Sequence, residues 1–254
     1  MIYQLKNPEH AAGLFCGWNE ALIWSCLQQV MGRVYVDHTE HPRSAMAILG
    51  DFCFFAGEPD AELVAYRPKD CQQDFRILIA RNAQWHPLIE ACYGERARRV
   101  LRYAIKKEAD VFQPEKLQTF RRLLPDQYTI RMIDEELYHL CRKSDWSLDL
   151  VSQYADYAMY QELGIGVGIL CGGELVAGAS SYATYHGGIE IEIDTKKAYR
   201  RQGLATVCGA ELILECLKRG LYPSWDAQNL WSVALAEKLG YHFDHEYPAF
   251  EIWG

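Results

Sequence analysis

One stretch constrains the fold of this chain more than any other: residues 189–195, which read Ile-Glu-Ile-Glu-Ile-Asp-Thr. Isoleucine and acidic side chains alternate with a period of two, which predicts a β-strand with one apolar and one acidic face. The stretch leads into a polar loop containing Gly203, and apolar residues then recur at spacings of three and four up to Leu217. That spacing predicts an amphipathic helix, so the segment as a whole predicts an α/β fold.

Turn and cap residues predict the other elements of the second half. Gly172-Gly173 separates two apolar runs and predicts a β-hairpin, Asp134 predicts a helix start, and Gly240 predicts a helix end. The expected order is β-α-α-β-β-β-α-β-α-β. The remaining predicted elements are a first strand at 128–133, a helix at 148–162, a strand at 222–225, a helix at 229–239 and a final strand at 250–253.

The first half is harder to interpret. Helices are expected within residues 8–30 and strands at 33–36 and 45–55. A strand at 75–80, a cap at Asn82, a stop at Gly94 and a strand at 100–106 repeat the strand–Asn–helix–Gly–strand pattern of residues 222–253. An internal duplication would explain this repeat. Chance would explain it equally well, because Asn caps and Gly stops are common at helix ends, and the sequence leaves both explanations open.

Pro125 follows a predicted helix and precedes the first strand of the second half. We therefore predict two domains, an N-terminal α/β lobe at 1–124 and a second domain at 125–254.

Composition narrows the classes of function. The formal net charge of −8 gives no bulk attraction for nucleic acid, and the most apolar stretch, 164–179, is too short to span a membrane. The N-terminus lacks the pattern of a signal peptide, and the nine cysteines include no Cys-x-x-Cys pair. His38-x-x-His41 and His242-x-x-His245 lack a matching ligand set. We expect a cytoplasmic protein with reduced thiols, no metal, no nucleic-acid partner and no membrane partner.

The loop before the predicted helix has the character of an anion site. Unpaired amides in the first turn of a helix, together with the helix dipole, attract a phosphate or pyrophosphate group, and Arg200 and Arg201 add positive charge. The spacing differs from that of a P-loop and from the three-glycine dinucleotide fingerprint.

The motif Arg200-x-x-Gly203-x-Ala205 instead resembles the pyrophosphate loop of the GNAT N-acetyltransferase superfamily. Downstream, Asn229-x-x-Ser232 and the Lys-Leu-Gly-Tyr sequence at 238–241 are similar to a later motif of that family. The resemblance covers about residues 128–254. It implies a GNAT fold there, with a central, mostly antiparallel sheet flanked by helices, and leaves open whether the N-terminal lobe is a degenerate GNAT-like half.

The resemblance also implies acetyl-coenzyme A as co-substrate and a set of contacts. Backbone groups at the end of the strand would stabilise the oxyanion, the loop would hold the diphosphate, and Asn229 and Ser232 would face the pantetheine and phosphate arm. The implied contacts are Ile193, Asp194, Thr195, Arg200, Arg201, Gln202, Gly203, Leu204, Ala205, Asn229 and Ser232.

Catalysis also needs a base and an acid. Among the acidic residues of the strand, Glu192 is the predicted base because it lies in mid-strand, although alternating glutamates also suit a solvated strand face. The family's tyrosine acid is replaced by Ala236. Ser232 or Tyr199 would then protonate the thiolate, the thiolate would leave unassisted, or the domain would bind without turnover.

The leading hypothesis is an N-acetyltransferase acting on an amine of a small molecule or peptide. The alternative is a non-catalytic acyl-coenzyme A-binding regulatory protein; an aminoacyl transferase using tRNA conflicts with the charge of −8. The N-terminal lobe has no phosphate loop, so we expect it to shape the acceptor site or an oligomer interface. The acceptor, the acyl chain and the oligomeric state, a homodimer included, stay open.

Overall fold

The structure is a computed structural model that describes residues 1–69, 71 and 74–254. Its contacts divide the chain into two compact units, residues 1–102 with 246–254, and residues 103–245. These limits differ from a single boundary at 124/125. Leu117 lies in the core of the second unit, so its helix belongs there, whereas Phe250 and Ile252 at the C-terminus lie in the core of the first unit.

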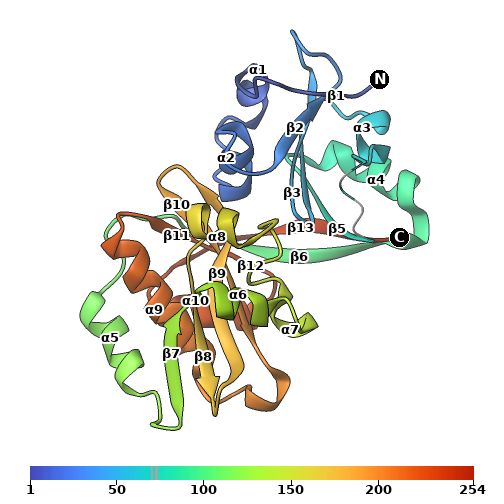
Figure 1. Cartoon of the computed structure of the whole chain (residues 1–254). Helices are drawn as coiled ribbons and strands as arrows, with labels where there is room; N and C mark the ends of the chain where they lie inside the picture. The colour runs from blue at the N-terminus through green and yellow to red at the C-terminus, as the bar shows by residue number, and fades with distance from the viewer. Residues whose placement is uncertain (70, 72–73) are drawn as a thin grey trace. The chain divides into compact units, whose positions relative to one another are not determined.

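The first unit is an α/β unit whose strands are ordered β1-β2-β3-β4-β5-β13-β6. Neighbours are antiparallel from β1 to β4, β4 and β5 are parallel, and β13 is antiparallel to β5. Its elements (Figure 1) are β1 (Tyr3–Gln4), α1 (Glu9–Ala12), α2 (Ala21–Leu27), β2 (Arg33–Val36), β3 (Ser44–Leu49), β4 (Phe52–Gly57), α3 (Ala61–Ala65), β5 (Phe75–Ala80), α4 (His86–Tyr93) and β6 (Ala97–Ile105).

The second unit has a sheet ordered β11-β10-β9-β8-β7, antiparallel except for the parallel pair β10–β11. The predicted mixed α/β fold, with a mostly antiparallel sheet flanked by helices, is confirmed. Its elements are α5 (Pro114–Arg122), β7 (Tyr128–Met132), α6 (Glu135–Cys141), α7 (Asp145–Leu148), α8 (Tyr157–Leu163), β8 (Gly166–Cys171), β9 (Glu174–Tyr185), β10 (Gly188–Thr195), α9 (Leu204–Lys218), β11 (Tyr222–Ser224), β12 (Asp226–Ala227) and α10 (Leu230–Leu239). The last strand, β13 (Phe243–Trp253), belongs to the sheet of the first unit.

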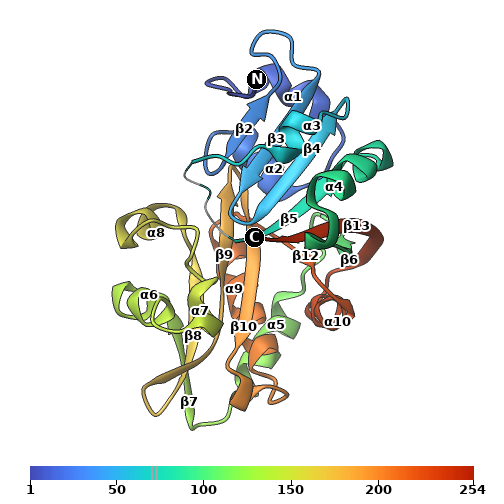
Figure 2. The ribbon, with the colours of Figure 1, turned by 90° about the vertical axis from the view of Figure 1, so that its right-hand side faces the viewer.

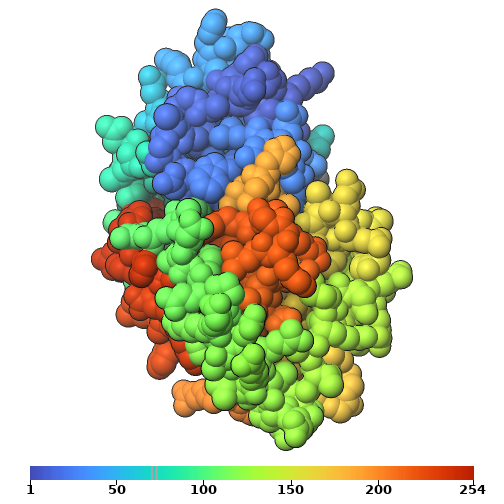
Figure 3. All heavy atoms as spheres, turned by 90° about the vertical axis from the view of Figure 1, so that its left-hand side faces the viewer, coloured from blue at the N-terminus to red at the C-terminus, as the bar shows by residue number. Residues whose placement is uncertain are grey.

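Helices cover both faces of this second sheet. Figure 2 shows α6, α7 and α8 on one side of the strands and α9 on the other, and Figure 3 shows α5 lying against α9 at the surface. The apolar face of β10 packs on α9, where Gly209 leaves room for Ile193 and Leu239: a Cβ at Gly209 would lie 3.1 Å and 2.7 Å from their Cδ1 atoms. This packing fixes α9, and with it the loop before α9, against β10.

The two halves of the chain share one plan. Both run strand, helices, three antiparallel strands, helix, parallel strand, helix and strand, from β1 to β6 and from β7 to β13. The repeat of strand, Asn cap, helix and strand seen in the sequence is therefore part of a repeat of the whole fold.

Three predicted elements need correction. The helix expected at 148–162 is confined to α8, because α7 already ends at Leu148, residues 149–156 form turns and bends, and Asp156 accepts a hydrogen bond from the Met159 amide (2.9 Å) and starts α8 at Tyr157. The strand expected at 45–55 is the hairpin β3–β4, which turns at Gly50 with φ 56°. The last strand begins at Phe243 and not at 250.

Candidate functional site

The predicted site centres on β10, whose two edges differ. Along one edge it pairs with β9 over its whole length, Gly188–Thr195. Along the other it pairs with β11 only over its first three residues, which end at Glu190 opposite Ser224. Within the described residues, the edge of residues 191–195 on that side therefore has no strand partner, and its backbone groups are open to an extended ligand.

The loop after β10 is held by its own side chains. The Arg200 Nε donates to the Thr195 carbonyl (3.1 Å), and the Tyr128 hydroxyl donates to Gln202 Oε1 (2.7 Å). Lys196 and Tyr199 both contact Glu174 at the β8–β9 turn. These contacts fix the path of the loop between β10 and α9.

The start of α9 has the features of an anion site. The helix has fifteen residues, its first turn carries no acidic side chain, and its N-cap is Gly203, which offers no side chain to the first amides. Gly203 has φ 83° and Arg201 has φ 62°, and no atom lies within 4 Å of the point where a Cβ of Gly203 would stand. No side chain caps the first-turn amides, so they are available to an anion such as a diphosphate.

Two side chains at the end of β10, those of Thr195 and Asp194, differ in how well they suit an anionic ligand. The Thr195 hydroxyl oxygen is buried and has no hydrogen-bond partner among the described residues. Burial, followed by the charge of Asp149, raises the pKa of Asp194 to about 6, although Arg200 and the Thr195 amide oppose the shift. The hydroxyl can serve a ligand, whereas the carboxylate would repel a phosphate once it is ionised.

The acidic face of β10 points away from α9. Asp194 lies opposite Gly178, and a side chain at Gly178 would come within 2.6 Å of Leu150, next to α7. Glu192 lies opposite Ser180, whose hydroxyl is 2.9 Å from that of Tyr160 on α8. Directly opposed residues share a face, so Glu192 and Asp194 lie on the side of the sheet that α6, α7 and α8 cover.

Asn229 and Ser232 lie in the first turn of α10 and are linked. The Asn229 side chain accepts from the Ser232 amide (3.0 Å), and the Ser232 hydroxyl accepts from the Trp225 indole (3.0 Å). Ser232 therefore keeps its own proton to donate. Ala236, one turn further along the helix, is fully buried.

Two tyrosines near the site are committed elsewhere. Tyr199 donates to Glu174 Oε2 (3.2 Å). Tyr241 is buried and donates to the Pro223 carbonyl (2.7 Å), so it is a residue of the core.

Other contacts of the site could not be found from the sequence. They join residues far apart in the chain, such as Tyr128 with Gln202, Asp149 with Asp194, and Glu190 with the Asp226 amide (2.7 Å). None of these pairs has a local sequence signal.

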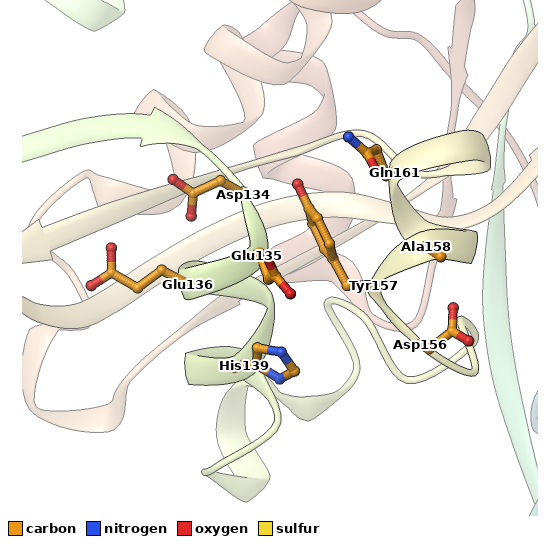
Figure 4. Close-up of a pocket in the computed structure, with 8 residues that line it drawn as sticks. All are labelled: Asp134, Glu135, Glu136, His139, Asp156, Tyr157, Ala158 and Gln161. Carbon is orange, nitrogen blue, oxygen red and sulfur yellow. The ribbon is translucent and has the colours of Figure 1, made fainter.

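Figure 4 shows the residues that line a pocket between α6 and α8. The volume of this pocket is about 920 Å³. The pocket has four acidic side chains, and three of them have structural partners: Asp134 and Asp156 accept from the Leu137 and Met159 amides, and Glu136 pairs with Arg131. Helix capping and ion pairing account for these charges, and we assign no ligand to the pocket. Its lining residues are Asp134, Glu135, Glu136, His139, Asp156, Tyr157, Ala158 and Gln161.

Comparison with known proteins agrees with this geometry. The model of the GNAT acetyltransferase family matches residues 12–250. The chain belongs to this family, and it is an acyltransferase of the GNAT type. It is also similar to the N-acetyltransferase YdfB of Bacillus subtilis (strain 168), with 24% identity over 239 residues that cover 90% of this chain and 88% of YdfB.

Solved structures extend the likeness over both halves. A GCN5-related N-acetyltransferase-like protein from Streptococcus suis 89/1591 is 45% identical, with a TM-score of 0.91 over 98% of this chain and 99% of that one. A tandem GNAT protein from the clavulanic acid biosynthesis pathway shares the fold at 10% identity, with a TM-score of 0.56 over 100% of this chain and 98% of that one.

Metal-ligand clusters and membrane-spanning helices are both absent from the described residues. No group of three or more histidine, cysteine, aspartate or glutamate side chains there is placed to hold a metal ion. No helix in the same residues is both long enough and apolar enough to cross a membrane.

Proposed function

We propose that residues 125–254 bind acetyl-coenzyme A along β10 and at the start of α9, and transfer its acetyl group to an amine of a small molecule or peptide. One observation carries the proposal: β10 loses its second strand partner after Glu190 and leads to a helix whose first turn has no side-chain cap. An extended arm containing amides can pair with such an edge while its diphosphate takes the helix amides.

The loop residues divide the work of holding the diphosphate. Main-chain amides of residues 202–205 would donate to its oxygens, and Arg200 and Arg201 supply positive charge beside them. The buried Thr195 hydroxyl adds a donor that nothing else in the described chain uses.

For the reaction, the co-substrate supplies a thioester carbon. Of residues 193–195, the main-chain groups of Ile193 and Thr195 point to the edge of β10 that lacks a strand partner and would stabilise the charge that develops on the thioester oxygen, whereas those of Asp194 point toward β9. Glu192 would accept the proton of the attacking ammonium group through water, since its carboxylate lies on the same strand.

The N–C bond then forms, the C–S bond breaks, and the Ser232 hydroxyl gives its proton to the sulfur. Its bond from the Trp225 indole orients it for this step. The nitrogen loses its second proton through water to Ser232, which restores the hydroxyl, and Glu192 releases the first proton to solvent after the products leave.

Ala236 supports a second candidate, a non-catalytic acyl-coenzyme A-binding regulatory protein. It stands, fully buried, where many family members have a tyrosine acid. Binding would be the same in both cases, and only turnover separates them.

The test is incubation of the purified protein with acetyl-coenzyme A and a panel of amines, read as thiol release, beside a calorimetric titration. Thiol release above the rate of hydrolysis supports the transferase. Saturable binding without release for any amine supports the regulatory protein. No binding at millimolar concentration overturns both.

A further inference from the structure

β10 and β11 are paired at one end and separate after Glu190, which leaves a gap beside residues 191–195 of β10. The hydrogen bonds of the paired end define where the pairing would continue. In a parallel ladder, donors and acceptors both advance by two residues at each step. The Tyr222 amide donates to the Gly187 carbonyl (2.8 Å). The same register, carried two steps further, would bring the Asp226 amide to the carbonyl of Ile191.

The Asp226 amide has another partner. It donates to Oε1 of Glu190 (2.7 Å). A side chain of β10 therefore accepts the hydrogen bond that a backbone carbonyl of β10 would otherwise accept. Glu190 is only 5% exposed, which keeps water from competing for this bond. Residues Asp226 and Ala227 form β12 and pair with β6 at Ala104 and Tyr103.

The first half shows the ladder without this interruption. There the Ile77 amide donates to the Asp51 carbonyl (2.8 Å), and two steps further the Arg81 amide donates to the Phe55 carbonyl (2.8 Å). Asp51 and Gly187 occupy the same position in the two ladders, so Phe54 in the first half corresponds to Glu190 in the second. Phe54 is buried, and its side chain has no hydrogen-bond acceptor. The parallel pairing of β4 and β5 therefore continues where the pairing of β10 and β11 stops.

We infer that Glu190 is a positioning residue that holds β10 and β11 apart, so that the gap stays open for the pantetheine arm of an acyl-coenzyme A. The inference rests on the proposed function. Without the carboxylate, the Asp226 amide would lose this partner in a partly buried site, and pairing with the Ile191 carbonyl is the nearest way to restore one. Closing that pairing would cover the edge that the arm uses.

The test compares Glu190→Phe, which copies the first half, with Glu190→Gln, which keeps the acceptor oxygen. Glu211→Phe is the matched control, because Glu211 is also a poorly exposed glutamate, paired with Arg121 (2.9 Å) on the outer side of α9. Each variant is titrated with acetyl-coenzyme A and with adenosine 3′-phosphate 5′-diphosphate, the part of coenzyme A that lacks the arm.

Glu190→Phe is expected to bind acetyl-coenzyme A at least about tenfold more weakly, because the edge amides lose their access to the arm. Its affinity for the diphosphate fragment stays within about twofold, since the start of α9 is untouched. Glu190→Gln stays within about threefold of the wild type for both ligands. Glu190→Val, a smaller change, is expected to behave like Glu190→Phe, so poor folding of one variant leaves the test intact.

The outcomes separate the two proposals. A wild type that binds acetyl-coenzyme A, together with Glu190→Phe and Glu190→Val variants that bind it equally well, overturns the inference alone. Equal loss of both ligands in these variants also overturns it, because that pattern shows a general loss of structure. A wild type that binds neither ligand overturns the proposed function and the inference with it.

Discussion

The two halves of the chain differ most at the helix that follows their third antiparallel strand. In the first half, α3 has five residues, and the Asp60 side chain accepts from the amides of Glu62 (2.7 Å) and Leu63 (3.3 Å). In the second half, α9 has fifteen residues and begins at Gly203 without such a cap. One half thus fills its own anion site with a carboxylate, while the other leaves the site open.

We infer from this difference that the shared fold is not sufficient for the proposed coenzyme site. The same order of elements and the same parallel strand pair occur in both halves. Among the residues that the structure describes, an uncapped helix and an interrupted strand pair occur together only in the second half. We therefore predict that the first half binds no second coenzyme A, and coenzyme A found at α3 would contradict this.

The largest effect is expected from Glu192→Gln. In the first half, the residue that corresponds to Glu192 is Ala56, when β4 is aligned with β10 by their parallel pairing. Ala56 has no group that can accept a proton. Removal of the proposed base should lower kcat/KM for the best amine about 100-fold while leaving acetyl-coenzyme A binding unchanged. Steady-state kinetics and calorimetry check this, with Glu162→Gln on the exposed side of α8 as control. Unchanged kcat/KM would exclude Glu192 as the base.

A smaller effect is expected from Asp194→Asn. The pKa of Asp194 is raised to about 6 by burial and by Asp149, against Arg200, and the β9 residues opposite it carry no titratable group. A bound diphosphate would raise that pKa further, so affinity should fall as the pH rises through about 6. At pH 8 the variant should bind acetyl-coenzyme A about fivefold more tightly than the wild type, and at pH 5 about equally.

Stability gives a second measure of the same group. A carboxyl whose pKa is raised in the folded state takes up protons on folding, so its contribution to stability is lost as the pH rises from about 4 to about 6. Asp194→Asn should therefore stabilise the protein by about 1 kcal/mol at pH 8 and very little at pH 4. Urea unfolding measures this, and a gain that is equal at both pH values would contradict it.

The smallest effect on the site is expected from Asp60→Ala. Loss of this cap should lower the free energy of unfolding by about 1 kcal/mol, because two amides of α3 lose their acceptor. Acetyl-coenzyme A affinity should not change. Asp156→Ala, which removes the cap of α8, is the matched control for stability. A change in affinity with Asp60→Ala would show that the first half takes part in binding.

Local patterns predicted much of the second half. The alternation at 189–195 gave β10, and Gly172-Gly173 gave the β8–β9 hairpin. Asn229 and Gly240 marked the two ends of α10, as the Asn229 cap and the φ of 115° at Gly240 confirm. In each case one or two neighbouring residues fix the backbone, so the sequence signal is direct.

The rest depends on contacts between distant residues. The bond from the Asp226 amide to Glu190, which ends the β10–β11 pairing, joins residues 36 positions apart. The return of β13 to β5 depends on Phe250 and Ile252 finding the core of the first unit. Such pairings follow from tertiary packing, which local propensity does not encode.

The proposed function depends most on the binding of a diphosphate at the start of α9. Calorimetric titration of acetyl-coenzyme A into Gly203→Asp and Gly203→Asn tests it directly, because both residues tolerate the φ of 83° and only the first adds a charge. Gly187→Asp, at a similar φ of 95° and at the far end of β10, is the control. We predict that Gly203→Asp binds at least about thirtyfold more weakly than Gly203→Asn, with Gly187→Asp like the wild type. Equal affinities for the two Gly203 variants would contradict the claim.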